Sequence, residues 1–456
     1  MAQLVPVARA RGAAVLGLGI SGLAAAQYLL SEKVSPLYLI EEGKPKDAAA
    51  AAELVRNGAI AIPPARLPDI GILIRSPGIR PSHPLVREAR ERGMTVTTEI
   101  GLFLDAVTVP VLAVSGSDGK TTTATLAHRI LTEAGYRTAL GGNIGTSLLP
   151  TLRSSASELA LLELSSFQLL DAFPLSRHSD IPLRAALTTL TENHLDFHGT
   201  MQAYTEAKLS LFAPGTLAVL PTSLAPLVGE RTRLRTFSLD AAPKPGTRHY
   251  SVFGDEIVCT EPSGDRRRLT SVRGFRLLGK HNLLNLLTAV ALTDGMAPPE
   301  AMRRAVLEAE PVRHRIEQVG LVGGVRFIES SIDSTPSRTA TTLTALSAPV
   351  ILLLGGKGKG LSLEPLLAPL AQYARATVTF GLEGERIHHF LCERGYSGQL
   401  LRREKLENAF HAAISIAGAG DTVLLSPACT SYDEFRDYAE RGECFRALVR
   451  ALGNGS

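Results

Sequence analysis

Residues 109–122 read Val-Pro-Val-Leu-Ala-Val-Ser-Gly-Ser-Asp-Gly-Lys-Thr-Thr. The apolar run at 109–114 predicts a buried strand, and the glycines after it allow several backbone N–H groups to face one anion. Lys120 adds a positive charge near the β- and γ-phosphates, and the Thr121 hydroxyl can hold Mg²⁺. Residues 122–131 lack Gly and Pro and predict a helix whose N-terminus faces the same phosphates. This stretch therefore predicts a site for a nucleoside triphosphate.

The spacing of this loop differs from that of a standard Walker loop. Gly116 and Gly119 enclose two residues, whereas a standard loop has four between its first glycine and Gly-Lys-Thr. A glycine-rich turn with a solvated lysine is the alternative interpretation. We favour the phosphate site because the loop connects a predicted strand to a predicted helix.

The composition is that of an ordinary globular chain. At ~150 residues per domain, the 456 residues predict about three domains. Hydrophobic residues make up 45% and charged residues 20%, so large cores can be buried. The net charge of +4 is small and Lys and Arg are scattered, so we expect no nucleic-acid or membrane partner. The run Arg266-Arg-Arg268 lies in a polar, turn-rich section between about 240 and 270 and is expected to be a solvated loop.

Cysteine usage and the N-terminus bear on the compartment. The four cysteines show no CxxC spacing, which predicts neither a disulfide framework nor a zinc site and fits a reducing cytoplasm. Arg9 and Arg11 precede an apolar run at 13–26 that looks like a signal peptide, but the glycines within the run indicate a nucleotide-binding turn instead. No apolar run reaches ~20 residues, so we expect no membrane insertion.

Short strands alternate with helical patterns, which indicates parallel sheets covered by helices. We expect an α/β protein of three domains: a Rossmann-like N-terminal domain (1–108), a P-loop ATPase central domain (109–310) and a Rossmann-like C-terminal domain (311–456). Helices are predicted at 21–31, 48–57 and 83–92. Strands are predicted at 13–18, 36–40, 70–75, 158–163, 185–189, 216–220, 325–328, 349–354, 376–380 and 421–425.

The first domain carries a second glycine motif. Gly17-Leu-Gly-Ile-Ser-Gly22 follows a predicted strand and opens a helix, and Glu41 and Glu42 end the next strand. This matches the dinucleotide fingerprint, in which the acidic residue holds a ribose hydroxyl, although any nucleotide diphosphate satisfies the same geometry. Ser76-Pro-Gly78 follows the third strand at the same sheet edge, and an ordinary turn is the alternative interpretation for it.

Polar residues in the central domain follow predicted strands. Glu163 ends one strand, where a carboxylate can reach Mg²⁺, and Asn143 lies in a glycine loop at 141–145. His194 follows another strand, and Lys208 lies in a helical pattern at 204–212. Nucleotide sites in two separate domains predict an ATP-driven enzyme that acts on a nucleotide-linked substrate.

At these residues the chain resembles the Mur ligases of peptidoglycan synthesis along almost its whole length. The short Gly-Ser-Asp-Gly-Lys-Thr-Thr loop is typical of the wider superfamily of ATP-dependent amide ligases, which includes folylpolyglutamate synthase. Four further motifs are typical of the branch that adds glutamate: Gly-Leu-Gly-Ile-Ser-Gly at 17–22, Leu-Glu-Leu-Ser-Ser-Phe-Gln-Leu at 162–169, Leu-Leu-Ser-Pro-Ala-Cys at 424–429 and Arg-Gly-Glu-Cys-Phe at 441–445.

The resemblance implies a reaction and a set of site residues. A substrate carboxylate attacks the γ-phosphate of ATP, and an amine then attacks the acyl phosphate; two Mg²⁺ ions and Lys120 offset the negative charge. The implied catalytic residues are Lys120, Lys208 and His194, and the implied metal ligands are Thr121, Glu163, His194 and Lys208. The implied ATP contacts are Gly116, Ser117, Asp118, Gly119, Lys120, Thr121, Thr122, Asn282 in an adenine-binding turn that starts at Leu278, and Arg315. The implied substrate contacts are Ile20, Ser21, Glu41, Ser76, Asn143, Ser165, Lys359, Ser431 and Tyr438, the last at a position where phenylalanine is frequent.

Lys208 occupies the position of a lysine that, in the family, is carbamylated by CO₂ to become an anionic metal ligand. The reaction needs a neutral amine, which is scarce at the ordinary lysine pKa of ~10.4. A lowered pKa or trapping by the metal is therefore required. A solvated helical lysine is the alternative that the sequence alone allows.

One stretch departs from the family pattern. Many relatives carry Asn-Asp-Ser-Lys-Ala-Thr-Asn after the first strand of the third domain, where this chain reads Glu329-Ser-Ser-Ile-Asp-Ser-Thr-Pro-Ser-Arg338. Ile332 replaces the lysine, and Ser330 replaces the aspartate expected to contact the ribose of ATP. Asp333 and Arg338 are the two candidates for compensation.

The resemblance implies a cytoplasmic, monomeric ligase that joins glutamate, as the D-isomer, to UDP-N-acetylmuramoyl-L-alanine with ATP. L-glutamate addition and folylpolyglutamate synthesis are the alternatives within the superfamily. A nicotinamide-dependent oxidoreductase would explain only the first glycine motif, and a non-catalytic nucleotide-binding regulator would release no phosphate.

Overall fold

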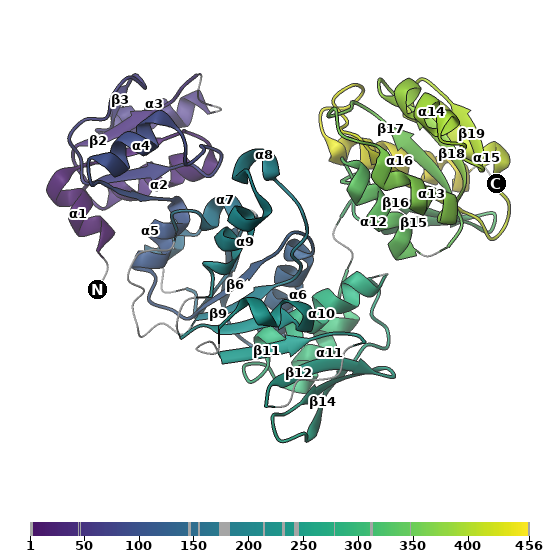
Figure 1. Cartoon of the computed structure of the whole chain (residues 1–456), viewed down its shortest axis with the longest axis horizontal. Helices are drawn as coiled ribbons and strands as arrows, with labels where there is room; N and C mark the ends of the chain where they lie inside the picture. Colours follow the sequence, from purple (N-terminus) through teal and green to yellow (C-terminus); the bar gives the residue numbers. More distant parts are fainter. Residues whose placement is uncertain are drawn as a thin grey trace. The chain divides into compact units, whose positions relative to one another are not determined.

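The computed structural model describes residues 3–43, 45, 47–144, 147–153, 156–172, 183–212, 215–229, 233–240, 246–277, 279–310, 313–346 and 348–454. Predictions that involve Gly145, Leu278 and the boundary at 310/311 touch residues outside this set. The chain forms two compact units, one of residues 1–275 and 282–308 and the other of residues 276–281 and 309–456. Three sheets provide the framework of these units and can be followed in Figure 1.

The first sheet has five parallel strands in the order β3-β2-β1-β4-β5. Its strands are β1 (Ala13–Leu16), β2 (Leu37–Ile40), β3 (Ile60–Ile62), β4 (Ile72–Arg75) and β5 (Thr95–Thr97), and its helices are α1 (Leu4–Arg11), α2 (Ile20–Ser31), α3 (Ala48–Arg56), α4 (Pro84–Glu91) and α5 (Glu99–Ala106). The central strands β1 and β4 are buried along their whole length, as expected for a parallel sheet with two covered faces.

The second sheet has nine strands in the order β14-β13-β12-β11-β10-β9-β6-β8-β7. Its strands are β6 (Val111–Ser115), β7 (Thr138–Gly142), β8 (Leu159–Glu163), β9 (Leu183–Leu187), β10 (Leu217–Pro221), β11 (Arg233–Phe237), β12 (Arg248–Phe253), β13 (Glu256–Thr260) and β14 (Arg266–Ser271), and its helices are α6 (Lys120–Glu133), α7 (Ser166–Leu169), α8 (Leu195–His198), α9 (Met201–Leu209), α10 (Lys280–Thr293) and α11 (Pro299–Leu307). Along this order, every neighbouring pair from β12 to β7, including those of β6, is parallel. Strands β12, β13 and β14 form an antiparallel meander.

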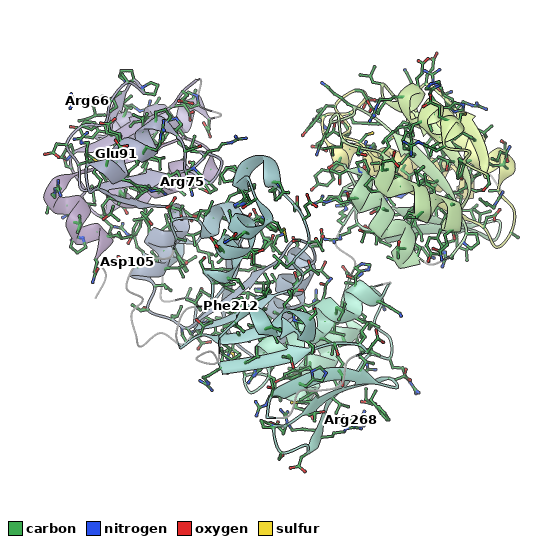
Figure 2. All side chains as sticks on the ribbon, in the orientation of Figure 1. Arg66, Arg75, Glu91, Asp105, Phe212 and Arg268 are labelled. Carbon is green, nitrogen blue, oxygen red and sulfur yellow. The ribbon has the colours of Figure 1, made fainter. Side chains whose placement is uncertain are left out.

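The meander corrects one prediction, because Arg266–Arg268 lie in the edge strand β14 and not in a loop. The Arg267 guanidinium donates to the buried Asp294 carboxylate at 2.8 Å. The Arg268 guanidinium pairs with Glu256 at 2.5 Å, and Figure 2 labels this residue. Arginines with partners on an edge strand discourage pairing with another chain, and a composition-based prediction does not detect this role.

The first two sheets share one apolar core. Buried side chains of β1, α5 and β8, such as Val15, Phe103 and Leu162, belong to a single cluster. Arg75 at the end of β4 is fully buried and donates through Nε to Asp171 Oδ2 at 3.0 Å and through Nη2 to the Leu170 carbonyl at 3.0 Å (Figure 2). The residue before the Ser76 turn is thus tied to the segment that follows α7.

The second unit contains the six-stranded sheet β15-β16-β20-β17-β18-β19, parallel except for the β15–β16 pair. Its strands are β15 (Glu317–Val322), β16 (Val325–Glu329), β17 (Val350–Gly355), β18 (Ala374–Phe380), β19 (Gln399–Arg402) and β20 (Thr422–Ala428), and its helices are α12 (Pro336–Leu346), α13 (Leu367–Tyr373), α14 (Gly384–Glu393), α15 (Leu406–Ile416) and α16 (Tyr438–Asn454). The division between the two units falls within the first turn of α10, between His281 and Asn282.

Most predicted strands and helices are present, with ends shifted by a few residues. The sequence analysis missed α1, which contains Arg9 and Arg11, and it missed α5 and the short strands β3 and β5. Within the part of the chain that the structure describes, no helix is long and apolar enough to cross a membrane.

Candidate active site

The predicted phosphate loop connects β6 to α6, and two of its glycines are required by their surroundings. Gly116 has φ +147°, and a Cβ there would lie 1.9 Å from Thr188 Oγ1. Gly119 has φ +78°, and a Cβ there would lie 2.2 Å from Asn285 Oδ1. Glycine adopts a positive φ without strain and has no Cβ to clash with these neighbours. The loop conformation therefore depends on glycine at both positions.

The middle of the loop is held by the segment that follows β9. The Ser117 amide donates to the Thr189 carbonyl at 2.9 Å, and the Ser117 hydroxyl donates to the Thr191 carbonyl at 2.9 Å. The same hydroxyl lies 2.9 Å from the hydroxyl of Tyr204 on α9. The Asp118 amide donates to Thr189 Oγ1 at 2.9 Å. These bonds fix the loop before any ligand binds, which is the preorganisation that an anion site needs.

Two lysines share the carbonyl oxygen of Gly116. Lys120 Nζ donates to it at 2.9 Å and to the Ser117 carbonyl at 2.8 Å. Lys208 Nζ, from α9, donates to it at 2.8 Å and is only 1% exposed. Burial, together with the charge of Lys120, lowers the pKa of Lys208 to about 7. The structure thus brings the two predicted catalytic lysines to one point of the loop.

Thr121 and Asn143 converge on Glu163 at the carboxyl end of β8. Glu163 is 1% exposed; its Oε2 accepts from the Thr121 hydroxyl at 2.9 Å, and its Oε1 accepts from Asn143 Nδ2 at 2.9 Å. A buried carboxylate beside a hydroxyl is the oxygen donor set that Mg²⁺ prefers. These residues therefore fit one magnesium ion next to the first turn of α6.

His194 lies at the N-terminus of α8 with φ +54°, a left-handed conformation that is uncommon for residues other than glycine. Its ring packs edge-on against Phe167, with centroids 4.8 Å apart. Phe167 is the second residue of α7, and Ser165 caps the N-terminus of that helix. Among the described residues, no group of three His, Cys, Asp or Glu side chains is gathered to hold a metal.

Asn282 and Asn285 on α10 lie behind the phosphate loop. Both are nearly buried, and Asn285 Nδ2 donates to Asn282 Oδ1 at 3.1 Å. The Thr123 hydroxyl of α6 donates to Asn285 Oδ1 at 3.3 Å. Sequence analysis named Asn282 but missed Asn285, whose contact with Gly119 no local pattern reveals. Arg315 is half-buried in the second unit, so its predicted approach to the phosphates stays a prediction.

The second glycine motif forms a turn between β1 and α2. Gly17 has φ +87°, and its carbonyl accepts from the Ser76 hydroxyl at 2.6 Å. Glu41 Oε2 accepts from the Leu18 amide at 2.5 Å, so this carboxylate is held beside the backbone of the turn, and its contact with a ribose stays a prediction. Ile20 and Ser21 begin α2, and Ile20 is 76% exposed. The structure therefore brings Gly17, Ile20, Ser21, Glu41 and Ser76 to one edge of the first sheet.

In the second unit, Lys359 and Ser431 follow the adjacent strands β17 and β20. Their loops are joined by backbone bonds between Lys357 and Thr430, and Lys359 Nζ donates to the Ser334 hydroxyl at 3.2 Å. Tyr438 begins α16 and is 44% exposed. Two loops with assigned substrate residues therefore meet at the carboxyl edge of this sheet.

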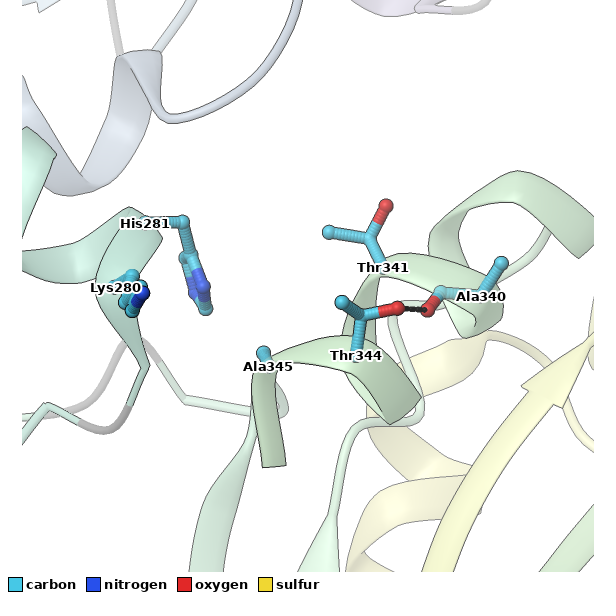
Figure 3. Close-up of a pocket in the computed structure, with 6 residues that line it drawn as sticks. All are labelled: Lys280, His281, Ala340, Thr341, Thr344 and Ala345. Atoms are coloured by element: carbon cyan, nitrogen blue, oxygen red, sulfur yellow. Dashed lines mark hydrogen bonds between the residues drawn. The ribbon is translucent and has the colours of Figure 1, made fainter. Parts of the chain in front are cut away.

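A cavity of about 540 Å³ lies beside the segment that leads into α10. Figure 3 shows the side chains of this segment on one side and those of α12 on the other. The lining residues are Lys280, His281, Ala340, Thr341, Thr344 and Ala345. The volume is within the usual range for small-molecule sites, and Lys280 and His281 belong to the turn assigned to adenine.

Three family models match consecutive parts of the chain. They are described as Mur ligase MurD-like, N-terminal domain (residues 11–98), Mur ligase middle domain (114–293) and Mur ligase, glutamate ligase domain (314–429). The UDP-N-acetylmuramoylalanine--D-glutamate ligase of Symbiobacterium thermophilum is 37% identical over 453 residues, which cover 96% of this chain and 98% of that protein. The chain belongs to the Mur ligase family.

Other similar proteins carry related names. A UDP-N-acetylmuramoylalanine--D-glutamate ligase from Burkholderia orbicola is 35% identical over 96% of each chain. The crystal structure of the UDP-N-acetylmuramate-alanine ligase MurC from Thermotoga maritima has a TM-score of 0.56 at 19% identity, covering 98% of this chain and 100% of that chain. The predicted three-domain α/β fold of a Mur ligase is confirmed.

The contact between Gly119 and Asn285 predicts a selective effect on the nucleotide site of this Mur ligase. Gly119→Ala adds a Cβ against Asn285, whose amide is held by Thr123 and Asn282 and cannot easily move. Because the loop must shift, we expect kcat/KM for ATP to fall by about 100-fold.

The matched control is Gly135→Ala at the end of α6. Gly135 also has a positive φ (+90°), but a Cβ there would meet nothing within 4 Å. We expect it to cost about 1 kcal/mol of stability and to leave kcat/KM for ATP unchanged. Equal kinetic losses in the two variants would contradict the assignment of Gly119 to the nucleotide site.

Proposed function

We propose that this chain is an ATP-dependent ligase that adds D-glutamate to UDP-N-acetylmuramoyl-L-alanine in cytoplasmic peptidoglycan precursor synthesis. The structural observation that carries the proposal is the preorganised phosphate loop with Lys120 and Lys208 on the Gly116 carbonyl. The specificity follows from relatives of that name, which match nearly the whole chain at 31–37% identity. Folylpolyglutamate synthesis, the alternative from the sequence, has no such relatives among those described above.

The chain's own residues provide what this chemistry requires. In the first step the substrate carboxylate attacks the γ-phosphate of ATP, so two anions must be brought together. Backbone N–H groups in the first turn of α6 and the Lys120 ammonium would offset this charge. Glutamate's amine then attacks the acyl phosphate carbonyl, forming the amide and releasing phosphate. Mg²⁺, held by Thr121 and Glu163, would supply further positive charge at the phosphates when bound.

We assign the binding of the three substrates to three parts of one polypeptide, which acts as a monomer. Residues 1–108 would bind the UDP moiety through the Gly17 turn, Ser76 and Glu41. Residues 109–310 would bind ATP and magnesium. Residues 311–456 would bind glutamate through Lys359, Ser431 and Tyr438, and Arg315 would reach the ATP phosphates. The clustering of each set at one sheet edge supports this division.

Lys208 would carry CO₂ as a carbamate that helps to hold a second Mg²⁺ with His194. Its ammonium first loses a proton, and the neutral amine then attacks the carbon of CO₂ and loses a second proton, which leaves an anionic carbamate. With a pKa of about 7, a large share of the Lys208 side chains is neutral at pH 7, against ~0.04% for an ordinary lysine.

The proposed function predicts a strict pattern of phosphate release. Wild-type enzyme with ATP, Mg²⁺ and UDP-N-acetylmuramoyl-L-alanine should release phosphate with D-glutamate and much more slowly with L-glutamate. The measurement is phosphate release coupled to mass detection of the UDP product. Turnover with L-glutamate at an equal rate, or with a folate substrate in place of the UDP substrate, would overturn the assignment.

The carbamate predicts that Lys208→Ala is almost inactive, because a buried cation site would lose its anionic ligand. A short-chain carboxylic acid in solution should partly restore activity, whereas Lys208→Glu, with a shorter side chain, should not substitute fully. Removing CO₂ should lower wild-type activity, bicarbonate should restore it, and the loss should be larger below pH 7, where the amine is protonated.

The control is Lys405→Ala, which removes an exposed lysine at the start of α15. It should respond to CO₂ like the wild type. Full activity of Lys208→Ala would refute the carbamate. So would a wild-type rate that is indifferent to CO₂ across this pH range.

A further inference from the structure

Two basic side chains meet over one turn at the carboxyl end of β16. Arg338, on the first turn of α12, donates through Nη1 to the Ile332 carbonyl at 3.3 Å. Lys359, in the loop after β17, donates through Nζ to the Ser334 hydroxyl at 3.2 Å. The turn is itself closed by the Ser334 amide, which donates to the Ile332 carbonyl at 2.8 Å. The acceptors of these two side chains, Ile332 and Ser334, thus lie within three consecutive residues of one turn.

The acidic residues of the same segment do not face these cations. Asp333 is 4% exposed, and its Oδ2 accepts from the hydroxyls of Thr342 at 2.7 Å and Ser426 at 2.8 Å. Glu329 is fully buried and accepts from His314 Nδ1 at 2.8 Å. Of the two candidates for compensation in this departing stretch, Asp333 is therefore committed to the interior, and only Arg338 faces solvent.

The side chain of Ser330 also lies in the interior of the protein. It is fully buried, and its hydroxyl accepts from the Ile316 amide at 3.2 Å. Ser334 is half-buried, and its hydroxyl accepts from Lys359. Arg338 and Lys359 are both exposed, and the ion pairs found among the described residues include neither of them.

The charges of these two residues act on each other. Partial burial, and then the nearby Arg338 guanidinium, lower the pKa of Lys359 below its ordinary value. Two positive charges close together repel each other, and an anion bound between them relieves the repulsion. An arginine presents a planar fork that matches a carboxylate, and a lysine presents a compact charge with three donors. The two side chains together therefore provide the donors that a carboxylate ligand requires.

We propose that Arg338 and Lys359 together bind a carboxylate of the incoming glutamate, which makes Arg338 a specificity-determining residue for a dicarboxylic amino acid. This inference rests on the proposed function, because glutamate is the substrate that it explains. An amino acid with two carboxylates carries a net negative charge, and a neutral analogue such as D-glutamine would leave one cation without a partner. Phosphate groups of ATP share this anion chemistry, so the test must separate the two.

The experiment compares steady-state kinetics of the wild type and Arg338→Met, varying ATP and D-glutamate separately. We expect KM for D-glutamate to rise by about 10- to 100-fold, the usual effect of losing a charge-assisted hydrogen bond, while KM for ATP stays the same. The preference for D-glutamate over D-glutamine should shrink by a similar factor. Arg338→Lys, which keeps the charge but loses the fork, should lie between the two.

Two further variants serve as rescue and control. Ile332→Lys in the Arg338→Met background returns a cation next to the vacated position and should recover much of the affinity for D-glutamate. Arg394→Met removes an exposed arginine that pairs with Glu364 elsewhere in the same unit, and it should change neither KM. Thermal melting should show all variants folded, because Arg338 and Arg394 are both exposed.

The outcomes are separable. A wild type that releases no phosphate with D-glutamate would refute the proposed function itself. An active wild type with an unchanged KM for D-glutamate in Arg338→Met would refute only the role of Arg338. A rise in KM for ATP in place of that for D-glutamate would show that Arg338 binds phosphate, which would also overturn the inference.

Discussion

The carbonyl oxygen of Gly116 accepts hydrogen bonds from two lysine side chains, and the rest of the site depends on this contact. It places two potential cations beside a loop whose backbone already favours an anion. In the protein interior two neighbouring ammonium groups cannot both stay charged without a cost, so the more buried one has a lowered pKa. That residue is Lys208, and a lowered pKa is what the proposed carbamate requires of its amine.

The surrounding structure preserves this arrangement. Ser117 ties the loop to the segment after β9, and Asn285 supports it from α10. Glu163, at the end of β8, presents its carboxylate beside the first turn of α6. Because adjacent parallel strands end at one edge, residues far apart in the sequence meet there without a long loop. The edge of the first sheet does the same for the Gly17 turn and Ser76.

The sequence predicted the parts of this site that obey a local rule. Glycine spacing identified both turns, an apolar run followed by Glu163 identified the end of β8, and the helix after Lys120 followed from its lack of Gly and Pro. Contacts between distant segments were not predictable. No sequence pattern near Arg75 predicts its contact with Asp171, and none near Gly119 predicts its contact with Asn285. The meander at β12–β14 was missed because its strands carry polar residues, including three consecutive arginines in β14, and lack the long apolar runs of the predicted strands. The choice between Asp333 and Arg338 needed the structure, because burial decides it.

The most direct test of the account is the titration of Lys208 itself in the enzyme without nucleotide or CO₂. Protein labelled with ¹³C at the lysine ε-carbons can be followed by NMR across pH, with the Lys208 signal assigned from its absence in Lys208→Arg. The account predicts a midpoint at about pH 7, and a higher midpoint in Lys120→Met, because one of the causes that lower the pKa is then removed. A wild-type midpoint at the ordinary lysine value of ~10.4 would contradict it.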